Sequence, residues 1–461
     1  MPLRICSLLL ALLANQAFAE EQYSDLWSLY QEARQEDPQL QQARAYGDAA
    51  EYWESEARGQ LLPHLSLNNT YSRSRQDYEQ GRILYNGSSH GLNLTQPLYD
   101  PSAWRSYQKF RELTQQQHLA ADDTHNQIAW QIAELYFAIL AAEDERSLTS
   151  AELQATQRNQ QRIQALYKRQ MAMLTDVLEA DARVAALQAN LLDADNSVQT
   201  SRDAMAERIG RPLSEPLKRL ASTPDFSQIK RNEVDWADKA TQHNPALRSQ
   251  KHSIAAAEHA FREAKAGHLP QINLNLSAQR SDLGYEGNPT PQSTNLIAAV
   301  GVQMPLYSGG STSARSSALY AEKDAASYEY ERLKREVIRE TRAAQLKVET
   351  APARIHAAQQ AQQAAIKSRL AAERAFELGV FNAVDVLERV RDEFRARRDL
   401  LRSQYNYVTQ LLLLYRWSGT LDEKDLRRCN ELLIQVAPPL EGQDAELKNF
   451  RRNATTRVLP R

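Results

Sequence analysis

The chain carries the same ordered set of landmarks twice, and this internal repeat constrains its fold more than any other feature. The first set is Asp37-Pro38, Leu62-Pro63, Pro97-Leu98-Tyr99 and Asp176-Val177-Leu178, and the second set is Asn244-Pro245, Leu269-Pro270, Pro305-Leu306-Tyr307 and Asp385-Val386-Leu387. Equivalent residues, such as Pro38 and Pro245, lie 207 to 209 positions apart. Because this period is far too long for a solenoid unit, it predicts two structurally equivalent halves.

The amino-terminal segment has the features of a secretory signal peptide. Arg4 gives a positive start, residues 5–13 are nearly all apolar, and Ala17-Phe18-Ala19 is a small-x-small cleavage site. The apolar run is about half of the ~20 residues that a membrane anchor needs. We therefore expect a signal peptide at 1–19, a first repeat at 20–231, a second repeat at 232–437 and a polar, disordered tail at 438–461.

Composition excludes several classes of protein. Cys6 leaves with the signal peptide, so Cys429 stands alone and no internal disulfide framework is expected. A net charge of −2, or −3 without Arg4, on a mixed surface gives no reason to expect nucleic acid. The nine histidines lack paired ligand spacing, and there is no nucleotide-binding loop or catalytic constellation. We expect no metal, no cofactor and no enzymatic activity.

Helix breakers are segregated from long helical stretches. Residues 102–209 contain neither Gly nor Pro, and residues 311–378 contain only Pro352. Apolar residues step by four and three along these stretches, as in Ile128, Ile132, Leu135 and Ile139. This seam on otherwise polar helices is the pattern of coiled-coil packing. Residues 102–170 would extend roughly 100 Å if they form one continuous helix.

Four alternating segments, at 65–72, 91–98, 271–279 and 295–306, predict β-strands of near membrane-spanning length. Two soluble hairpins with one wet face are the competing interpretation. If the strands lie in lipid, the chain must form oligomers, because two hairpins cannot close a barrel and open edges are not tolerated there. The polar connections at 76–88 and 282–294 would then face the cell exterior.

Four prolines stand where predicted strands meet predicted helices, namely Pro63, Pro97, Pro270 and Pro305. At such a junction proline ends a ladder or starts a helix without losing a needed N–H. Ending a strand or starting a helix is enough to explain each of these prolines, and we predict no further role for them.

Each long helical stretch contains one point of reversal. The first turn includes Gln170, Thr175 and Asp176, and the second includes Gly379, Phe381, Asn382, Asp385 and Glu388. Gly379 suits the left-handed end of a helix, and Asn382 with Asp385 resembles a capping box. Acids in a first helical turn gain about 0.3–1 kcal/mol from the helix dipole. Helix capping alone therefore accounts for Asp176, Asp385 and Glu388.

At these turns the chain resembles the TolC family of trimeric outer-membrane efflux and secretion channels. The similarity runs from about residue 24 to about residue 433. It includes Leu29-Tyr30, Asp37-Pro38, both Leu-Pro strand entries, Gln96-Pro97-Leu98-Tyr99-Asp100, Pro305-Leu306-Tyr307-Ser308-Gly309-Gly310, both Asp-Val-Leu turns and Gly419-Thr420-Leu421-Asp422. The resemblance implies a mainly α fold with a small β part. Long coiled-coil helices would form an α-barrel tunnel, and four strands per protomer would contribute to a 12-stranded trimeric outer-membrane β-barrel.

The resemblance also implies a function. The homotrimer would be a passive exit duct in outer-membrane lipid, serving a tripartite efflux pump, type I protein secretion, or both. Its partners would be a periplasmic adaptor (membrane fusion) protein and an inner-membrane RND or ABC transporter. In the family, acids at the positions of Asp385 and Glu388 ring a periplasmic constriction, and Thr175 and Asp176 belong to the same gate.

Two residues depart from the family pattern. Gln170 stands where the first turn usually has glycine, and Phe381 stands where an arginine can tie neighbouring coils shut. Arg389 is a candidate substitute for that arginine. A second hypothesis for the whole chain is a soluble periplasmic coiled-coil adaptor or structural protein. An adaptor, however, would show one hairpin between lipoyl-like halves rather than a tandem duplication.

Overall fold

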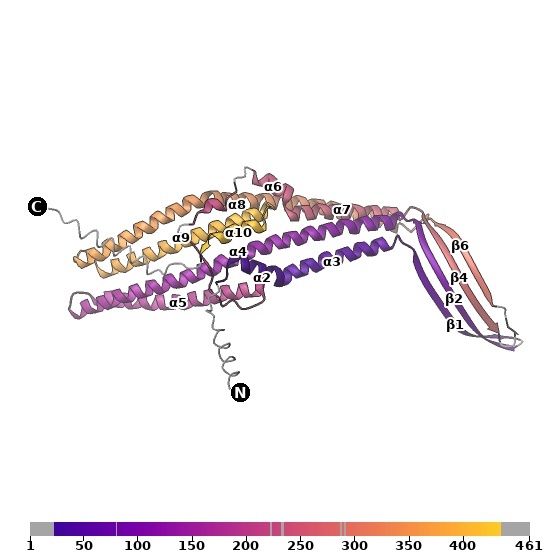
Figure 1. The fold of residues 1–461 in the computed structure, drawn as a ribbon, viewed down its shortest axis with the longest axis horizontal. Coiled ribbons are helices and arrows are strands. Elements are labelled where there is room, and N and C mark those ends of the chain that lie inside the picture. Colours follow the sequence, from indigo (N-terminus) through magenta and orange to yellow (C-terminus); the bar gives the residue numbers. More distant parts are fainter. Residues whose placement is uncertain are drawn as a thin grey trace, which may run out of the picture. The chain divides into compact units, whose positions relative to one another are not determined.

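A computed structural model describes residues 23–434 except 80, 222–223, 232–234, 286–287 and 290–291. The predicted signal peptide and carboxy-terminal tail lie outside the described residues. The first half contains α2 (Leu26–Glu36), α3 (Pro38–Gly59), β1 (His64–Tyr78), β2 (Gly81–Tyr99), α4 (Pro101–Lys168) and α5 (Leu174–Ile209). The second half repeats this order with α6 (Trp236–His243), α7 (Pro245–Ala266), β4 (Gln271–Tyr285), β6 (Ser293–Gln303), α8 (Ser311–Glu377) and α9 (Ala383–Trp417) (Figure 1).

The repeated order of elements confirms the internal duplication. Short elements lie outside the repeated order: β3 (Arg219–Leu220), η1 (Phe226–Gln228), β5 (Asn288–Pro289), α10 (Glu423–Glu431) and β7 (Leu433–Ile434). The repeat extends to local detail, because the side chains of Asp37 and Asn244 each cap the helix that follows. Asp37 accepts from Gln39 N–H at 2.8 Å, and Asn244 accepts from Leu247 N–H at 3.1 Å.

The long helices confirm the prediction from helix breakers. Helix α4 runs for 68 residues and α8 for 67 residues, each without interruption. Pro352 lies inside α8 and does not end it. Proline removes one backbone hydrogen bond from a helix interior, so 41 residues of helix before Pro352 and 25 after it outweigh that local loss. No helix among the residues described here combines the length and the apolar character that crossing a membrane requires.

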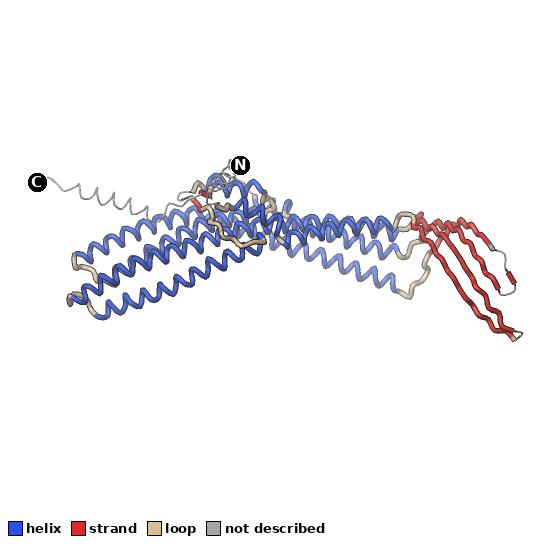
Figure 2. Tube along the Cα trace, turned by 60° about the horizontal axis from the view of Figure 1, so that its bottom comes forward, coloured by secondary structure: helices blue, strands red, loops and turns tan. Residues whose placement is uncertain are grey.

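The described chain forms two compact units, and each contains parts of both halves. The sheet unit comprises residues 42–123 and 241–336, and the helical unit comprises the other described residues. Figure 2 separates the strands from the helices by colour.

The sheet of the sheet unit is antiparallel throughout. Strand β2 lies between β1 and β4, and β4 pairs on its other side with β6 and the short β5. The register aligns Leu65, Leu94, Leu276 and Ala298 in one cross-strand row, and Leu67, Leu92, Ala278 and Leu296 in the next. Because side chains alternate along each strand, both rows lie on one face. On β1, β2 and β4 the other face carries polar rows such as Ser66, Asn93 and Ser277, and the last of these pairs with Ile297 of β6.

The strands differ from the sequence expectation in extent. Strands β1 and β2 pair as far as Tyr78 and Gly81, so the predicted loop at 76–88 is wrong. Strand β4 continues to Tyr285, which also takes residues 282–285 out of the second predicted loop. The rest of that loop includes residues outside the described part of the chain. Backbone pairing extends these strands beyond the apolar alternation on which the prediction depended.

Three of the four junction prolines lie between elements. Pro63 and Pro270 directly precede β1 and β4, and Pro305 follows β6. Pro97 instead lies inside β2, two residues before its end, so its placement at a strand–helix junction needs correction. The register shifts between Pro97 and Tyr99, and this irregularity accommodates a residue without an N–H.

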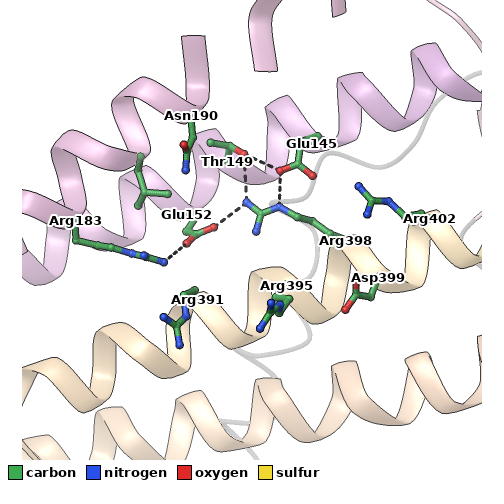
Figure 3. A pocket seen from close by; sticks show the side chains of 11 residues that line it. Glu145, Thr149, Glu152, Arg183, Asn190, Arg391, Arg395, Arg398, Asp399 and Arg402 are labelled. Carbon is green, nitrogen blue, oxygen red and sulfur yellow. Dashed lines mark hydrogen bonds and ion pairs between the residues drawn. The ribbon is translucent and has the colours of Figure 1, made fainter. Parts of the chain in front are cut away.

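In the helical unit, two buried carboxylates tie the long helices together. Glu152 of α4 pairs with Arg398 of α9 at 2.8 Å and with Arg183 of α5 at 3.4 Å (Figure 3). Glu393 of α9 pairs with Arg369 of α8. The side chain of Glu152 is 3% exposed and that of Glu393 is 2% exposed. Burial without partners would be costly for a charge, and the arginines remove that cost.

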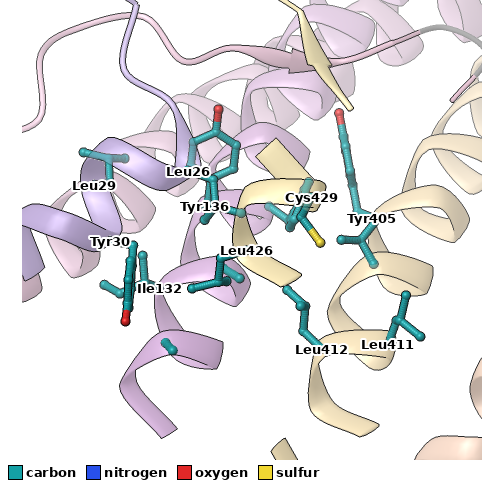
Figure 4. Packing of buried hydrophobic residues seen from close by; sticks show 14 of the residues in the cluster. Leu26, Leu29, Tyr30, Ile132, Tyr136, Tyr405, Leu411, Leu412, Leu426 and Cys429 are labelled. Carbon is teal, nitrogen blue, oxygen red and sulfur yellow. The ribbon is translucent and has the colours of Figure 1, made fainter. Parts of the chain in front are cut away.

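The main hydrophobic core of the helical unit gathers side chains from helices far apart in sequence. Leu29 of α2, Tyr136 of α4, Leu412 of α9 and Cys429 of α10 are all essentially inaccessible (Figure 4). Around this core, β3 pairs with β7, and Arg219 of β3 forms ion pairs with α4. The helical unit therefore has a core of its own.

Candidate gate at the coiled-coil turns

The first turn joins α4 to α5 around a strained residue. Gln170 has a φ of 59°, and it is the non-glycine residue with positive φ in the described chain. A side chain in this left-handed region meets steric conflict that glycine avoids. Helix α5 begins at Leu174, and the Asp176 carboxylate accepts from Met173 N–H at 3.1 Å. Thr175 is exposed beside it.

The second turn joins α8 to α9 with residues better suited to their positions. Gly379 has a φ of 74°. The Asn382 side chain accepts from Asp385 N–H at 2.8 Å, and the Asp385 carboxylate accepts from Asn382 N–H at 3.3 Å. These reciprocal bonds form a capping box. Asp385 thus has a capping contact, whereas Glu388 lies exposed one turn further along α9 and makes none.

The two turns are brought together by a small apolar cluster. Ile163 of α4, Ala180 of α5, and Ala383 and Leu387 of α9 form it, with Phe376 packed against it. The Arg162 guanidinium of α4 lies 4.6 Å from the centre of the Phe376 ring of α8. Its distance to a Glu377 carboxylate oxygen is 4.0 Å. Apolar and cation–π contacts therefore hold the coils at this end, together with a hydrogen bond of 2.7 Å from Gln160 of α4 to the Asp181 carboxylate of α5.

Large apolar side chains are exposed at both turns. Met171 is 71% exposed and Met173 is 68% exposed in the first turn, and Leu378 and Val380 are more than 70% exposed in the second. Phe381 is 44% exposed. Such a concentration of exposed apolar surface is typical of a contact site for another chain.

The charged residues of the second turn interact within α9. Arg389 lies 2.9 Å from Asp392 and 3.5 Å from Glu388. Both partners belong to its own helix, so within one protomer Arg389 does not link the two coils. That link comes instead from Arg398, 13 residues beyond Asp385 on α9, through Glu152 of α4.

Sequence reasoning missed Glu152, Glu393 and Arg398. In the sequence of a polar helix, a glutamate that becomes buried cannot be distinguished from one that stays exposed. One signal was present, because Arg391, Arg395, Arg398 and Arg402 recur at the four–three spacing of one helix face.

Comparison with known proteins places these features in context. The outer membrane efflux protein family matches residues 29–211 and 236–420. The outer membrane protein TolC of Vibrio cholerae is 28% identical over 431 residues, covering 91% of this chain and 95% of that protein. The alkaline protease secretion protein AprF of Pseudomonas aeruginosa is 26% identical over 452 residues, covering 94% of this chain and 92% of that protein. The Campylobacter jejuni CmeC outer membrane channel shares the fold, with a TM-score of 0.77 at 14% identity over 89% of this chain and 90% of that one.

Proposed function

The chain belongs to the outer membrane efflux protein family, and on that premise we propose that three copies assemble into one closed channel. The protein is an outer-membrane exit duct for efflux and type I secretion, with a tunnel in the periplasm. Its relatives are channel proteins rather than enzymes. The trimeric state, the partner proteins and the gate are the parts of this function that we propose.

The main support for a trimer is that, within the described residues, the sheet of one protomer has two unpaired edges. The outer edges of β1 and β6 have no further strand among the residues that the structure describes. One face of the sheet is apolar and exposed: the exposed fraction is 67% for Leu67 and 79% for Leu296. Unpaired edges are not tolerated in hydrocarbon, and three sheets of four long strands provide the twelve that close a barrel.

Matched substitutions on the two faces of β1 test this assembly. We expect Leu67→Arg to reduce the amount of heat-modifiable trimer in outer-membrane fractions, because a charge on the lipid face costs about 2–4 kcal/mol near the bilayer midplane. Asn68→Arg, on the opposite face, is the control and should leave the trimer intact. Equal yields from both variants, or cross-linking that stops at dimers, would refute the proposal.

The duct requires an energy source in another protein. We infer that a periplasmic adaptor and an inner-membrane RND or ABC transporter supply it. Similarity to AprF supports a secretion role beside efflux. A deletion strain should show increased drug sensitivity, loss of an exported protein, or both, and the wild-type gene should restore each defect. A deletion strain unchanged in both assays would contradict the assignment.

The gate proposal concerns the acids of the second turn. In a trimer, Asp385 and Glu388 would place six carboxylates around one axis, and focused negative charge attracts cations. Glu388→Gln is the sharper test, because Glu388 makes no capping contact. We expect weaker cation selectivity and weaker block by trivalent cations in planar bilayers.

Asp392→Asn is the matched control for Glu388→Gln. It removes the other carboxylate partner of Arg389, one turn further from the end of the coil. It should leave selectivity and block unchanged. If Glu388→Gln behaves like this control, Glu388 does not lie in the constriction.

A further inference from the structure

The arginines of α9 form a continuous stripe on one helix face. Arg391, Arg395, Arg398 and Arg402 are separated by four, three and four residues. Residues three and four apart are neighbours on a helix surface. At ~1.5 Å per residue, the four side chains span roughly 16 Å along the helix axis. Like charges at such spacing repel one another unless anions lie between them.

This stripe borders an open, solvent-accessible cavity of about 560 Å³ in the helical unit, and Arg391, Arg395 and Arg402 are exposed at its rim. Helix α4 contributes two buried lining residues, Thr149 and Glu152. Arg183 of α5 lines the opposite wall. Figure 3 shows Arg183 and Arg398 reaching Glu152 from the two sides.

The carboxylates of the cavity do not neutralise its arginines. Arg398 lies between Glu152, at 2.8 Å, and Glu145, at 2.7 Å. In the described part of the chain, Arg395 and Arg402 have no carboxylate within 4.0 Å, and the nearest to Arg391 is Asp392 at 3.8 Å.

The lining residues as a whole also carry an excess of positive charge. The five arginines are opposed by three carboxylates, those of Glu145, Glu152 and Asp399, so the formal charge of the lining is +2. A concave site with excess charge of one sign concentrates counter-ions.

We propose that this cavity binds a multivalent oxyanion built from linked phosphoryl groups. Guanidinium groups bind phosphate oxygens in bidentate geometry, and each such contact is charge-assisted. Arg395 and Arg402 lie seven residues apart, roughly 10 Å along the axis. One orthophosphate reaches only one of them fully, whereas a short phosphate chain reaches both. The anion would also contact Arg183, and so would join α5 to α9.

Thermal unfolding of the purified full-length protein in detergent tests the proposal, with sodium tripolyphosphate as the probe. We expect a saturable rise in Tm of about 2–3 °C above that in NaCl of equal ionic strength. Orthophosphate should produce a smaller rise. The double variant Arg395→Gln/Arg402→Gln should bind tripolyphosphate at least tenfold more weakly in calorimetric titration.

The control variant removes the same charge elsewhere on the coils. Arg158 of α4 and Arg354 of α8 are exposed and do not line the cavity, so Arg158→Gln/Arg354→Gln should retain binding. Equal loss in both double variants, or no tripolyphosphate effect beyond ionic strength, would overturn the proposal. If the glutamine variant does not fold, Arg395→Lys/Arg402→Lys keeps the charge without the planar fork. Unchanged binding by the lysine variant would likewise overturn it.

Discussion

Replacing Glu393 by glutamine tests how strongly a buried charge fastens α8 to α9. The Glu393 carboxylate accepts hydrogen bonds from Arg369 of α8 and from Arg397 of its own helix. Its side chain is 2% exposed, whereas those of Arg369 and Arg397 are 19% and 14% exposed. Glutamine keeps the shape but removes the charge, so two guanidinium groups face a neutral amide.

The expected loss follows from burial and from the partners that remain. Removing one member of a buried pair typically costs 3–5 kcal/mol. Arg369 retains Glu373, and both arginines keep some contact with water, so we expect about 2–3 kcal/mol. An unfolding entropy of ~2.1 cal/mol/K per residue gives about 0.8 kcal/mol/K for roughly 400 residues. The Tm should therefore fall by roughly 2–4 °C.

Glu373→Gln is the matched control, because Glu373 pairs with the same Arg369 but is 29% exposed. Its loss should cost about 0–1 kcal/mol, or roughly 1 °C at most. Both variants should be unfolded in detergent at equal protein concentration, with hydrogen exchange of the α9 amides measured in parallel. If the two substitutions lower the Tm equally, or if exchange in α9 is unchanged, the assignment of Glu393 as the main fastener is wrong.

Three further outcomes follow from the described residues. Both Gln170 and Gly379 have positive φ, which glycine adopts without steric conflict. Gln170→Gly should therefore stabilise the first turn by about 1 kcal/mol, and Gly379→Ala should destabilise the second turn by a similar amount. Hydrogen exchange of the backbone amides at each turn measures both effects. Burial raises the pKa of Asp25, but its hydrogen bonds, first that from Lys218, outweigh burial and leave the pKa below 3.8. This pair therefore stabilises the fold above the unfolded pKa, and the Tm difference between wild type and Lys218→Met should shrink as the pH falls below about 4. The Cys429 thiol, whose pKa is raised by complete burial, should react with Ellman's reagent only after urea unfolding.

The long helices were predictable because their signal is distributed along the sequence. Absence of glycine and proline over more than 60 residues, with a four–three apolar seam, leaves few alternatives to a coiled coil. The capping box at Asn382 and Asp385 was predictable for a different reason, because its bonds are local. Both predictions depend on residues that are neighbours in sequence or on one helix face.

Features that depend on distant residues were not predictable in the same way. The outer part of β1 contains Arg73, Arg75 and Asp77, which obscure the alternation although the backbone continues to pair with β2. Glu152 and Glu393 are buried only because arginines from other helices reach them. Pro352 is a helix breaker by residue type, yet α8 continues through it, with Val348 and Ile355 buried on either side.

The difference between the helical unit and the sheet has a consequence for the order of folding. The helical unit buries residues such as Tyr136 and Leu412 within a single chain, so it has the means to become native alone. Within the single described chain the sheet has unpaired outer edges and an exposed apolar face, so in the proposed trimer other molecules would have to cover both. A newly exported protomer would therefore mature in two steps, one unimolecular and one dependent on concentration. Between these steps the strands would be the part of the chain most vulnerable to proteases and to aggregation.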